Sequence, residues 1–460
     1  MKTLSDPTRL PAPVHQASGA EVELVIDCAR THLEPERCDR IRHLLSLDLD
    51  WKFVIVLATQ HRVLPLVFHA LKQIDSNHVP PEVFTHLQTF FGRHIFRNLN
   101  QLAEITRLIN LLKQHQIPAI PFKGPTLTLN IYGDIALRQF DDLDILVAPA
   151  DFLNARQVLM KQGGYQRPKP SNFLSLEQEH AHLRSVCECS LVHRTQKTVV
   201  DLHQQLTGGT FIAYPFEFSA LWQRLTPVSA PHQLFTLCPE DLLLYLCVHG
   251  TKSLWKRLVW ICDVAALIQQ TPALDWESLL QKAQTAKIER MLLLGLHLAE
   301  QVLGNTLPAL ITQRIAADAT VRALSEQVCQ RLLAGEYGLS SHFDLEMMKF
   351  QFRAIADPKA QVRYCLKCFY RHGLTPIRRL FQPTEKEWLF VQLPRSLHFL
   401  YYLIRPVRLL GREVTNLWQH LLSREIDTAS GTQSRRQKTK DKRQKAEGQR
   451  MNETLDERAG

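Results

Sequence analysis

Apolar positions recur with a helical period along the first quarter of the chain. In the stretches 21–31, 51–74 and 81–116 they fall three and four residues apart, as on one face of an amphipathic helix. Pro80 and Pro81 stand at the start of the longest stretch, and proline is well suited to the first turn of a helix. The pattern therefore predicts an all-helical region over residues 19–116.

The pattern changes after residue 116, where short apolar runs alternate with helix-like pieces. The run 117–122 (IPAIPF) and the run 142–147 (DLDILV) are typical of buried strands. Helix-like segments follow each of them, at 125–132 and 149–164, and two further strand-like runs lie within 182–206. We predict an α/β module with the order strand, helix, strand, helix, strand, strand, over residues 117–214.

Helical periodicity returns from residue 215 and continues to about 424, interrupted by several prolines. We predict an α+β protein in which a small mixed sheet is framed by helical N- and C-terminal regions. Residues 1–18 are predicted to be a flexible N-terminus. Residues 215–424 form the helical C-terminal region, and residues 425–460 a disordered basic tail.

Composition and charge refine this description. The 460 residues are 45% hydrophobic and 22% charged, as in folded globular proteins. The net charge of +10 is concentrated in residues 431–450, which hold eight basic and two acidic side chains. Such a tail has too few apolar residues to fold alone; it is a candidate for weak nucleic-acid contact, and equally a solvated terminus.

No segment reads as a secretory signal, and no window is long and apolar enough to span a membrane. We therefore expect a cytoplasmic protein whose ten cysteines are reduced. Cys187 with Cys189 and Cys365 with Cys368 have spacings that occur in zinc sites, but turn residues are missing around both pairs. Packed thiols are the favoured interpretation.

The strongest chemical signal is a pair of carboxylates inside an apolar strand. Asp142 and Asp144 are two residues apart, so they point to the same side of the strand. Two adjacent carboxylates repel each other unless a cation lies between them, and Mg²⁺ prefers such ligands together with substrate phosphates. Asp201, at the end of another predicted strand, is the candidate third ligand of a two-metal site, with Mn²⁺ as an alternative ion.

The Lys-Gly-Pro break before this strand supplies groups that suit phosphate. Gly124 allows close approach of the backbone, and the helix that follows offers free N–H groups at its start. Lys123 adds a positive charge and Thr126 a hydroxyl, while Arg138 is a candidate to contact phosphates or to hold the carboxylates. Each feature alone is common, since an Asp-x-Asp often ends a solvated strand; their order and spacing raise the chance of a nucleotide site.

This combination resembles the polymerase-beta-type nucleotidyltransferase superfamily. Within it, residues 122–147 (FKGPTLTLNIYGDIALRQFDDLDILV) resemble the uncharacterised nucleotidyltransferases of the NTP-transferase-5 type. Residues 49–71, 199–206, 247–268 and 403–413 are also similar to that family, so the resemblance spans roughly residues 45 to 412. It implies a mixed sheet and metal-dependent transfer of a nucleoside monophosphate from an NTP, a reaction of the EC 2.7.7 type, to an acceptor that is not assigned.

The resemblance also implies roles for individual residues. Asp142, Asp144 and Asp201 would be catalytic metal ligands, with Asp201 also the base for an acceptor hydroxyl. The nucleotide would be contacted by Lys123, Gly124 and Arg138. The chain departs from the superfamily at Pro125, where a serine is usual, and from the closer family at Asp141, where glycine is frequent.

Three more residues are candidates for the acceptor site, namely His203, His249 and Lys252, although packing explains each of them as well. The acceptor is a small molecule, a protein or an RNA, and transfer to tRNA or protein would make the chain a toxin-like enzyme. The main alternative is a catalytically inactive binding or scaffold protein with the same fold. A metal-dependent glycosyltransferase is a weaker alternative, because it needs a larger parallel sheet.

Overall fold

The computed structural model describes residues 19–74, 78–168, 187–207, 217–228, 233–335, 345–369, 397, 400–404 and 406–408. The chain divides into two compact units, Met1–Cys368 and Phe369–Gly460. In the second unit, residues 401–404 and 406–408 are helical. The predicted flexible N-terminus and the basic tail, with its suggested nucleic-acid contact, lie outside the described residues.

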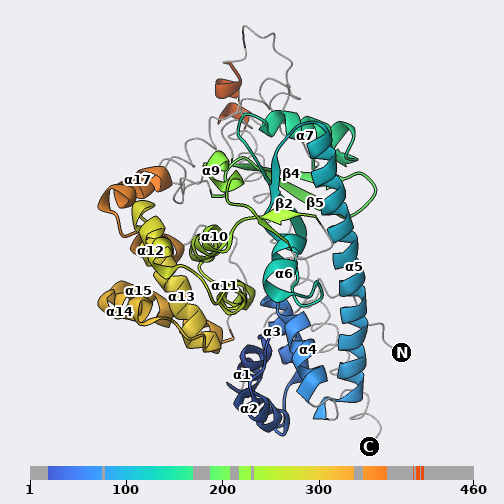
Figure 1. The fold of residues 1–460 in the computed structure, drawn as a ribbon, viewed down its shortest axis with the longest axis vertical. Helices are drawn as coiled ribbons and strands as arrows, with labels where there is room; N and C mark the ends of the chain where they lie inside the picture. The colour runs from blue at the N-terminus through green and yellow to red at the C-terminus, as the bar shows by residue number, and fades with distance from the viewer. Residues whose placement is uncertain are drawn as a thin grey trace, which may run out of the picture. The chain divides into compact units, whose positions relative to one another are not determined.

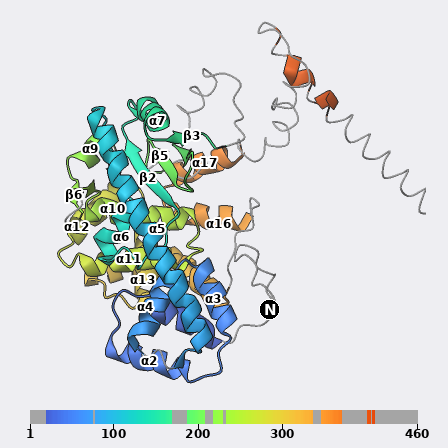
Figure 2. The same ribbon diagram turned by 90° about the vertical axis from the view of Figure 1, so that its right-hand side faces the viewer.

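The first unit begins with four helices: α1 (Gly19–Cys28), α2 (Pro35–Leu45), α3 (Trp51–Gln60) and α4 (Leu64–Ile74). The long helix α5 (Pro81–Gln114) follows, with Pro81 in its first turn as the sequence indicates. Figures 1 and 2 show α5 running from the N-terminal helices to a position beside the sheet. This helix therefore connects the helical N-terminal part with the α/β part.

Five strands form one mixed sheet in the order β1-β2-β5-β4-β3. Their bounds are β1 (Ala119–Pro121), β2 (Asp142–Val147), β3 (Tyr165–Gln166), β4 (Glu188–His193) and β5 (Val199–His203). Strands β2 and β5 are parallel, and the other neighbouring pairs are antiparallel. Helices α6 (Gly124–Tyr132) and α7 (Phe152–Lys161) follow β1 and β2. The predicted fold class is confirmed.

Strand β2 separates two hydrophobic cores because its side chains alternate between the two faces of the sheet. Leu143, Ile145 and Val147 pack in a core with residues of α5 and α7. Leu146 belongs to the other core, which includes α6 and the helices that follow the sheet. Asp142 and Asp144 share the face of Leu146, so the carboxylates face the side of the sheet that these later helices cover.

The rest of the first unit is mainly helical. Its elements are α9 (Phe218–Trp222), α10 (Pro239–Lys252), α11 (Leu258–Gln270), α12 (Trp276–Thr285), α13 (Glu289–Leu303), α14 (Ala309–Ala317), α15 (Ala319–Leu333), α16 (Leu345–Ala354) and α17 (Pro358–Cys368). Helix α6 contacts both α5 and α11 (Figure 1). The completely buried indole of Trp255 packs on Gly250 of α10 and Gly295 of α13, where a Cβ atom would overlap the ring.

A small two-stranded sheet of β6 (Thr226–Pro227) and β7 (Phe235–Thr236) precedes α10, in a region predicted to be helical. Strands of two residues are too short to show a period of two in the sequence. The Thr236 hydroxyl donates to the Pro121 carbonyl at 2.8 Å, which ties this small sheet to β1. All ten cysteines are free, and none of the described helices could cross a membrane.

Candidate active site

The three predicted carboxylates lie together on β2 and β5. The two strands are parallel, and their register places Asp144 directly opposite Asp201. Asp142 is two residues before Asp144 in β2 and therefore on the same face. Asp144 is buried, whereas Asp142 and Asp201 are half-buried. The sheet thus gathers three acidic side chains that are up to 59 positions apart in the sequence numbering.

Asp144 is held by two basic side chains. Its Oδ1 accepts hydrogen bonds from Lys123 Nζ at 3.2 Å and from His203 Nε2 at 3.0 Å. Its Oδ2 is buried without a hydrogen-bond partner. The Lys123 ammonium also lies 5.2 Å from the centre of the Tyr245 ring, a cation–π distance. His203, a candidate for the acceptor site, therefore contacts a predicted metal ligand directly.

These contacts divide the carboxylates into two electrostatic classes. Burial alone would raise the pKa of Asp144, but the Lys123 charge and the His203 hydrogen bond outweigh it and hold this pKa well below its usual range. Burial and the neighbouring Asp144 charge raise the pKa of Asp142 to about 6. The pKa of Asp201 is also raised, mainly by burial. The site therefore has one firmly ionised carboxylate beside two with increased proton affinity.

Gly124 permits the close packing of the Lys-Gly turn against β2. Its φ angle is +57°, and a Cβ atom here would lie 2.9 Å from the Asp142 carbonyl oxygen. Helix α6 starts at this glycine, with Pro125 in its first turn. The Thr126 hydroxyl donates to the Lys123 carbonyl at 2.8 Å, and Thr126 is completely buried. For Thr126 to contact phosphate as predicted, its hydroxyl would have to give up the hydrogen bond to the Lys123 carbonyl.

Arg138 forms a buried ion pair with Asp263 of α11. Its Nε lies 2.7 Å from Asp263 Oδ1 and its Nη2 lies 2.8 Å from Oδ2. The Tyr132 hydroxyl donates to the same Oδ1 at 2.8 Å. The guanidinium is thereby committed to a contact between the segment before β2 and α11, and a nucleotide would have to compete with Asp263 for it.

The other two predicted acceptor residues differ in their surroundings. His249 of α10 stacks on Tyr245 with a centroid distance of 5.8 Å and meets the Trp260 ring at 5.5 Å. Burial, and then the nearby Lys123 charge, hold the pKa of His249 well below its usual range, so its imidazole is neutral. Lys252 is exposed at the end of α10. Of these two residues, His249 is therefore the one whose charged neighbours include Lys123 and Asp144.

Two residues of this region were not among the sequence candidates. Tyr245 lies one helical turn before His249 and beneath the Lys123 ammonium. Asp263 is a lone carboxylate in the apolar run WICDVAALI, a position where burial without a partner would be costly. That pattern could have identified Asp263 as a buried ion-pair residue, although it does not indicate which cation binds it.

The donor atoms fit a divalent cation in chemical type. Among the described residues, no three His, Cys, Asp or Glu side chains are already arranged as a metal site. However, Asp144 Oδ2 and Asp201 Oδ1 are buried oxygens without hydrogen-bond partners, on neighbouring strands. Carboxylate oxygens are the ligands that Mg²⁺ prefers, and it usually completes its coordination with water and substrate phosphates.

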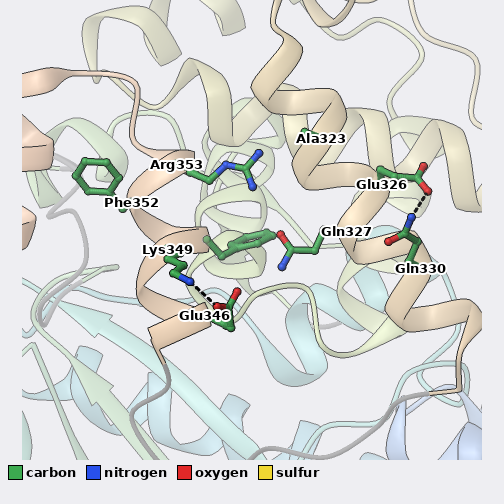
Figure 3. A pocket seen from close by; sticks show the side chains of 9 residues that line it. Ala323, Glu326, Gln327, Gln330, Glu346, Lys349, Phe352 and Arg353 are labelled. Carbon is green, nitrogen blue, oxygen red and sulfur yellow. Dashed lines mark hydrogen bonds and ion pairs between the residues drawn. The ribbon is translucent and has the colours of Figure 1, made fainter.

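A separate hollow of about 450 Å³ lies between α15 and α16. Figure 3 shows polar and apolar side chains around it, with Gln327 of α15 and Arg353 of α16 on opposite walls. Lys349 pairs with Glu346 within α16, and the Gln330 side chain donates a hydrogen bond to Glu326 within α15. None of the predicted site residues lines this hollow.

Comparison with protein families gives one match. A family model described as uncharacterised nucleotidyltransferase matches residues 48–304, which is more than half of the chain. The matched span includes the Lys-Gly turn, the three carboxylates and Asp263, and it confirms the resemblance inferred from the motifs. It ends before residues 403–413, which that resemblance included. No curated protein matches the chain.

Proposed function

The chain belongs to the family of uncharacterised nucleotidyltransferases, and from this premise we propose that it transfers a nucleoside monophosphate from an NTP to a hydroxyl group of an acceptor. The observation that carries the proposal is the pairing of Asp144 with Asp201 in register, each with one buried oxygen that has no partner. Such oxygens are costly in a folded protein unless a ligand uses them. The donor, the metal and the acceptor class are all part of the proposal.

Asp142, Asp144 and Asp201 would hold the cation, Mg²⁺ or alternatively Mn²⁺. When bound, the ion reduces the negative charge on the phosphate oxygens and lowers the pKa of the acceptor hydroxyl. Lys123 and His203 keep Asp144 ionised and fix its side chain through their contacts with Oδ1. This supports a site in which one ligand is permanently charged and in place.

Asp201 is proposed to act as the base. Its raised pKa gives this carboxylate a greater affinity for a proton than an ordinary aspartate has, which suits a group that accepts one. Asp201 takes the proton of the acceptor hydroxyl while the acceptor oxygen forms a bond to the α-phosphorus. The bond between that phosphorus and the bridging oxygen breaks, and pyrophosphate leaves.

The remaining candidates would position the two substrates. The first turn of α6, which starts at Gly124, offers backbone N–H groups to phosphate. Lys123 adds charge beside them. His249, whose environment includes Lys123 and Asp144, is proposed to line the acceptor side together with Lys252. Catalysis would then come mainly from positioning and electrostatics.

The test is transfer of label from α-labelled ATP, GTP, CTP and UTP into a cell extract with Mg²⁺. We expect transfer by the wild type, and a loss of about 100-fold or more in Asp142→Asn/Asp144→Asn, since several kcal/mol of charge stabilisation disappear. Asp151→Asn is the matched control, because Asp151 lies on the same module before α7 and its side chain caps no helix.

Transfer that persists in the double variant would contradict the proposal, as would its absence with all four nucleotides. Metal-dependent nucleotide binding without any transfer would favour the inactive binding or scaffold protein instead.

A further inference from the structure

Two arginines from separate parts of the chain pair with Asp141, the residue directly before β2, and a third arginine belongs to the same region. Arg62, in the turn between α3 and α4, forms an ion pair with Asp141 Oδ2. Arg97 of α5 places Nη1 3.3 Å from Asp141 Oδ1. Arg257 stands directly before α11, and the amide of the next residue, Leu258, donates to the side chain of His61, the residue before Arg62. We call Arg62, Arg97 and Arg257 the arginine cluster.

The fold holds two members of this cluster in place through His61. His61 is buried. Its ring Nδ1 accepts a hydrogen bond from the Leu258 amide at 3.2 Å, and its backbone carbonyl accepts one from the Val259 amide at 3.2 Å. Arg62, the next residue, has a backbone φ angle of 58°, which residues other than glycine rarely adopt. The turn after α3 and the first turn of α11 are therefore clamped together, with Arg62 and Arg257 beside the clamp.

Arg97 also holds the backbone, because its Nη2 donates to the Phe140 carbonyl, but the fold does not require the whole accumulation of charge. The side chains of Arg97 and Asp141 are 42% and 48% exposed, and ion pairs so open to water contribute only about 0 to 1 kcal/mol. Three guanidinium groups also repel one another, and Asp141 balances only one of them. In the described part of the chain, the Arg257 guanidinium packs over the Trp260 ring at 5.6 Å and donates no hydrogen bond. An excess of cations remains.

The two other cations near the carboxylates are already bound. Lys123 is hydrogen-bonded to Asp144, and the Arg138 guanidinium is paired through two nitrogens with Asp263. In the arginine cluster, by contrast, Arg62 and Arg97 share the single carboxylate of Asp141, and Arg257 keeps its hydrogen-bonding capacity in the described part of the chain. Guanidinium groups bind phosphate oxygens through two parallel hydrogen bonds, which makes arginine well suited to polyphosphate.

We propose that the arginine cluster binds the β- and γ-phosphates of the nucleotide and then the pyrophosphate that leaves. Asp141 acts as an internal counter-ion that occupies part of this place until phosphate displaces it. The cluster is linked to the carboxylates through Arg257, because its guanidinium packs over Trp260 and the Trp260 ring meets His249 at 5.5 Å. His249 in turn stacks on Tyr245, which lies beneath the Lys123 ammonium that contacts Asp144. This inference rests on the proposed function, since it assigns the polyphosphate part of the same site.

The test is calorimetric titration of the whole chain with inorganic pyrophosphate in Mg²⁺, a probe that needs no knowledge of the base. Arg62→Gln and Arg257→Gln are each expected to weaken binding about tenfold, the loss of one charge-assisted hydrogen bond. Asp141→Asn is expected to tighten it severalfold, because the competing carboxylate is removed. Arg107→Gln is the matched control: Arg107 lies on α5 like Arg97 and pairs with Glu104 instead.

Several outcomes separate this inference from the proposed function. Pyrophosphate affinity that is equal in the wild type and in both arginine variants would overturn it, and weaker binding by Asp141→Asn would overturn the counter-ion role. Circular dichroism of each variant, compared with Arg107→Gln, reports whether the fold is kept.

The same titrations are repeated with the four NTPs and with the monophosphates. The variants should lose affinity for triphosphates but not for monophosphates. If NTP binding depends on Asp142 and Asp144 but not on the arginines, only the cluster assignment fails. If no NTP binds the wild type, the proposed function fails with it.

Discussion

Among the buried acid–base clusters of the described residues, the one at Asp263 and the one at Asp144 differ in one respect. In the first, both oxygens of Asp263 are used: Oδ1 by Arg138 Nε and the Tyr132 hydroxyl, and Oδ2 by Arg138 Nη2. In the second, Oδ1 of Asp144 accepts both hydrogen bonds, from Lys123 and His203, and Oδ2 has no partner. One cluster is closed, and the other keeps an open acceptor.

This difference separates a structural contact from a site. A closed cluster satisfies every charge it buries and so joins α11 to the segment before β2. An unused buried oxygen costs free energy, and here two of them belong to carboxylates that face each other on neighbouring strands, an arrangement that a cation would complete. Arginine in an apolar segment suggested a ligand contact for Arg138, whereas the structure engages it in the closed cluster. Its nucleotide contact stays a prediction.

The largest effect is expected from breaking the closed cluster. Arg138→Met leaves Asp263 charged, buried and unpaired, which should reduce the free energy of unfolding by about 3 to 5 kcal/mol at pH 7. Urea denaturation followed by circular dichroism measures it. Adding Asp263→Leu removes the second charge and should recover much of the loss. A loss below 1 kcal/mol would show that the pair is not a closed structural contact.

His61 is a buried group that is hydrogen-bonded but uncharged, and it extends the comparison to a neutral side chain. Burial, and then the Arg257 charge, lower the pKa of His61 from 6.5 to about 4. Between these values the unfolded chain binds a proton that the folded protein excludes, so stability falls as pH falls from 7 to 5, by about 2 kcal/mol for this residue. His61→Gln should lose that much less stability over this range.

Urea titrations at pH 7 and pH 5 measure this difference, with His86→Gln on the exposed side of α5 for comparison. The same pH dependence in His61→Gln and the wild type would contradict the assignment of a neutral, excluded imidazole.

Removing a charge from the carboxylates beside the open cluster should stabilise the protein, whereas removing one from the closed cluster destabilises it. The raised pKa of Asp142 means that the folded protein disfavours its charge, so Asp142→Asn should increase the free energy of unfolding by about 1 kcal/mol at pH 7 without metal. Mg²⁺ should raise the thermal midpoint of the wild type but not that of the variant. A variant less stable than the wild type would place Asp142 in the fold rather than in a ligand site.

The smallest effect is expected at an exposed pair. Arg42 contacts Asp39 at 2.6 Å on α2, and their side chains are 52% and 76% exposed. Arg42→Gln should change the free energy of unfolding by less than about 0.5 kcal/mol, because water competes for the same charges. Thermal denaturation in low and high salt measures it. A loss comparable to that of Arg138→Met would remove the distinction between exposed and buried pairs.

Periodicity in the sequence was sufficient to predict the order of the longer elements. The long helix α5, the strand β2 and the α+β class follow from local spacing of apolar residues, which is a property of neighbours in the chain. The strands β3, β6 and β7 were missed because two-residue strands have no period. The same local logic placed Asp142 and Asp144 on one face of a strand.

The sequence by itself therefore determined which groups are available: three carboxylates, a Lys-Gly turn and an apolar strand to hold them. Only the tertiary structure decided which of them lie next to one another and which partners they contact. Asp201 meets Asp144 through a parallel register, and Arg138 meets a carboxylate 125 positions away. Such pairs are set by the packing of distant elements, and a buried charge selects its partner by proximity in space, for which no local pattern exists.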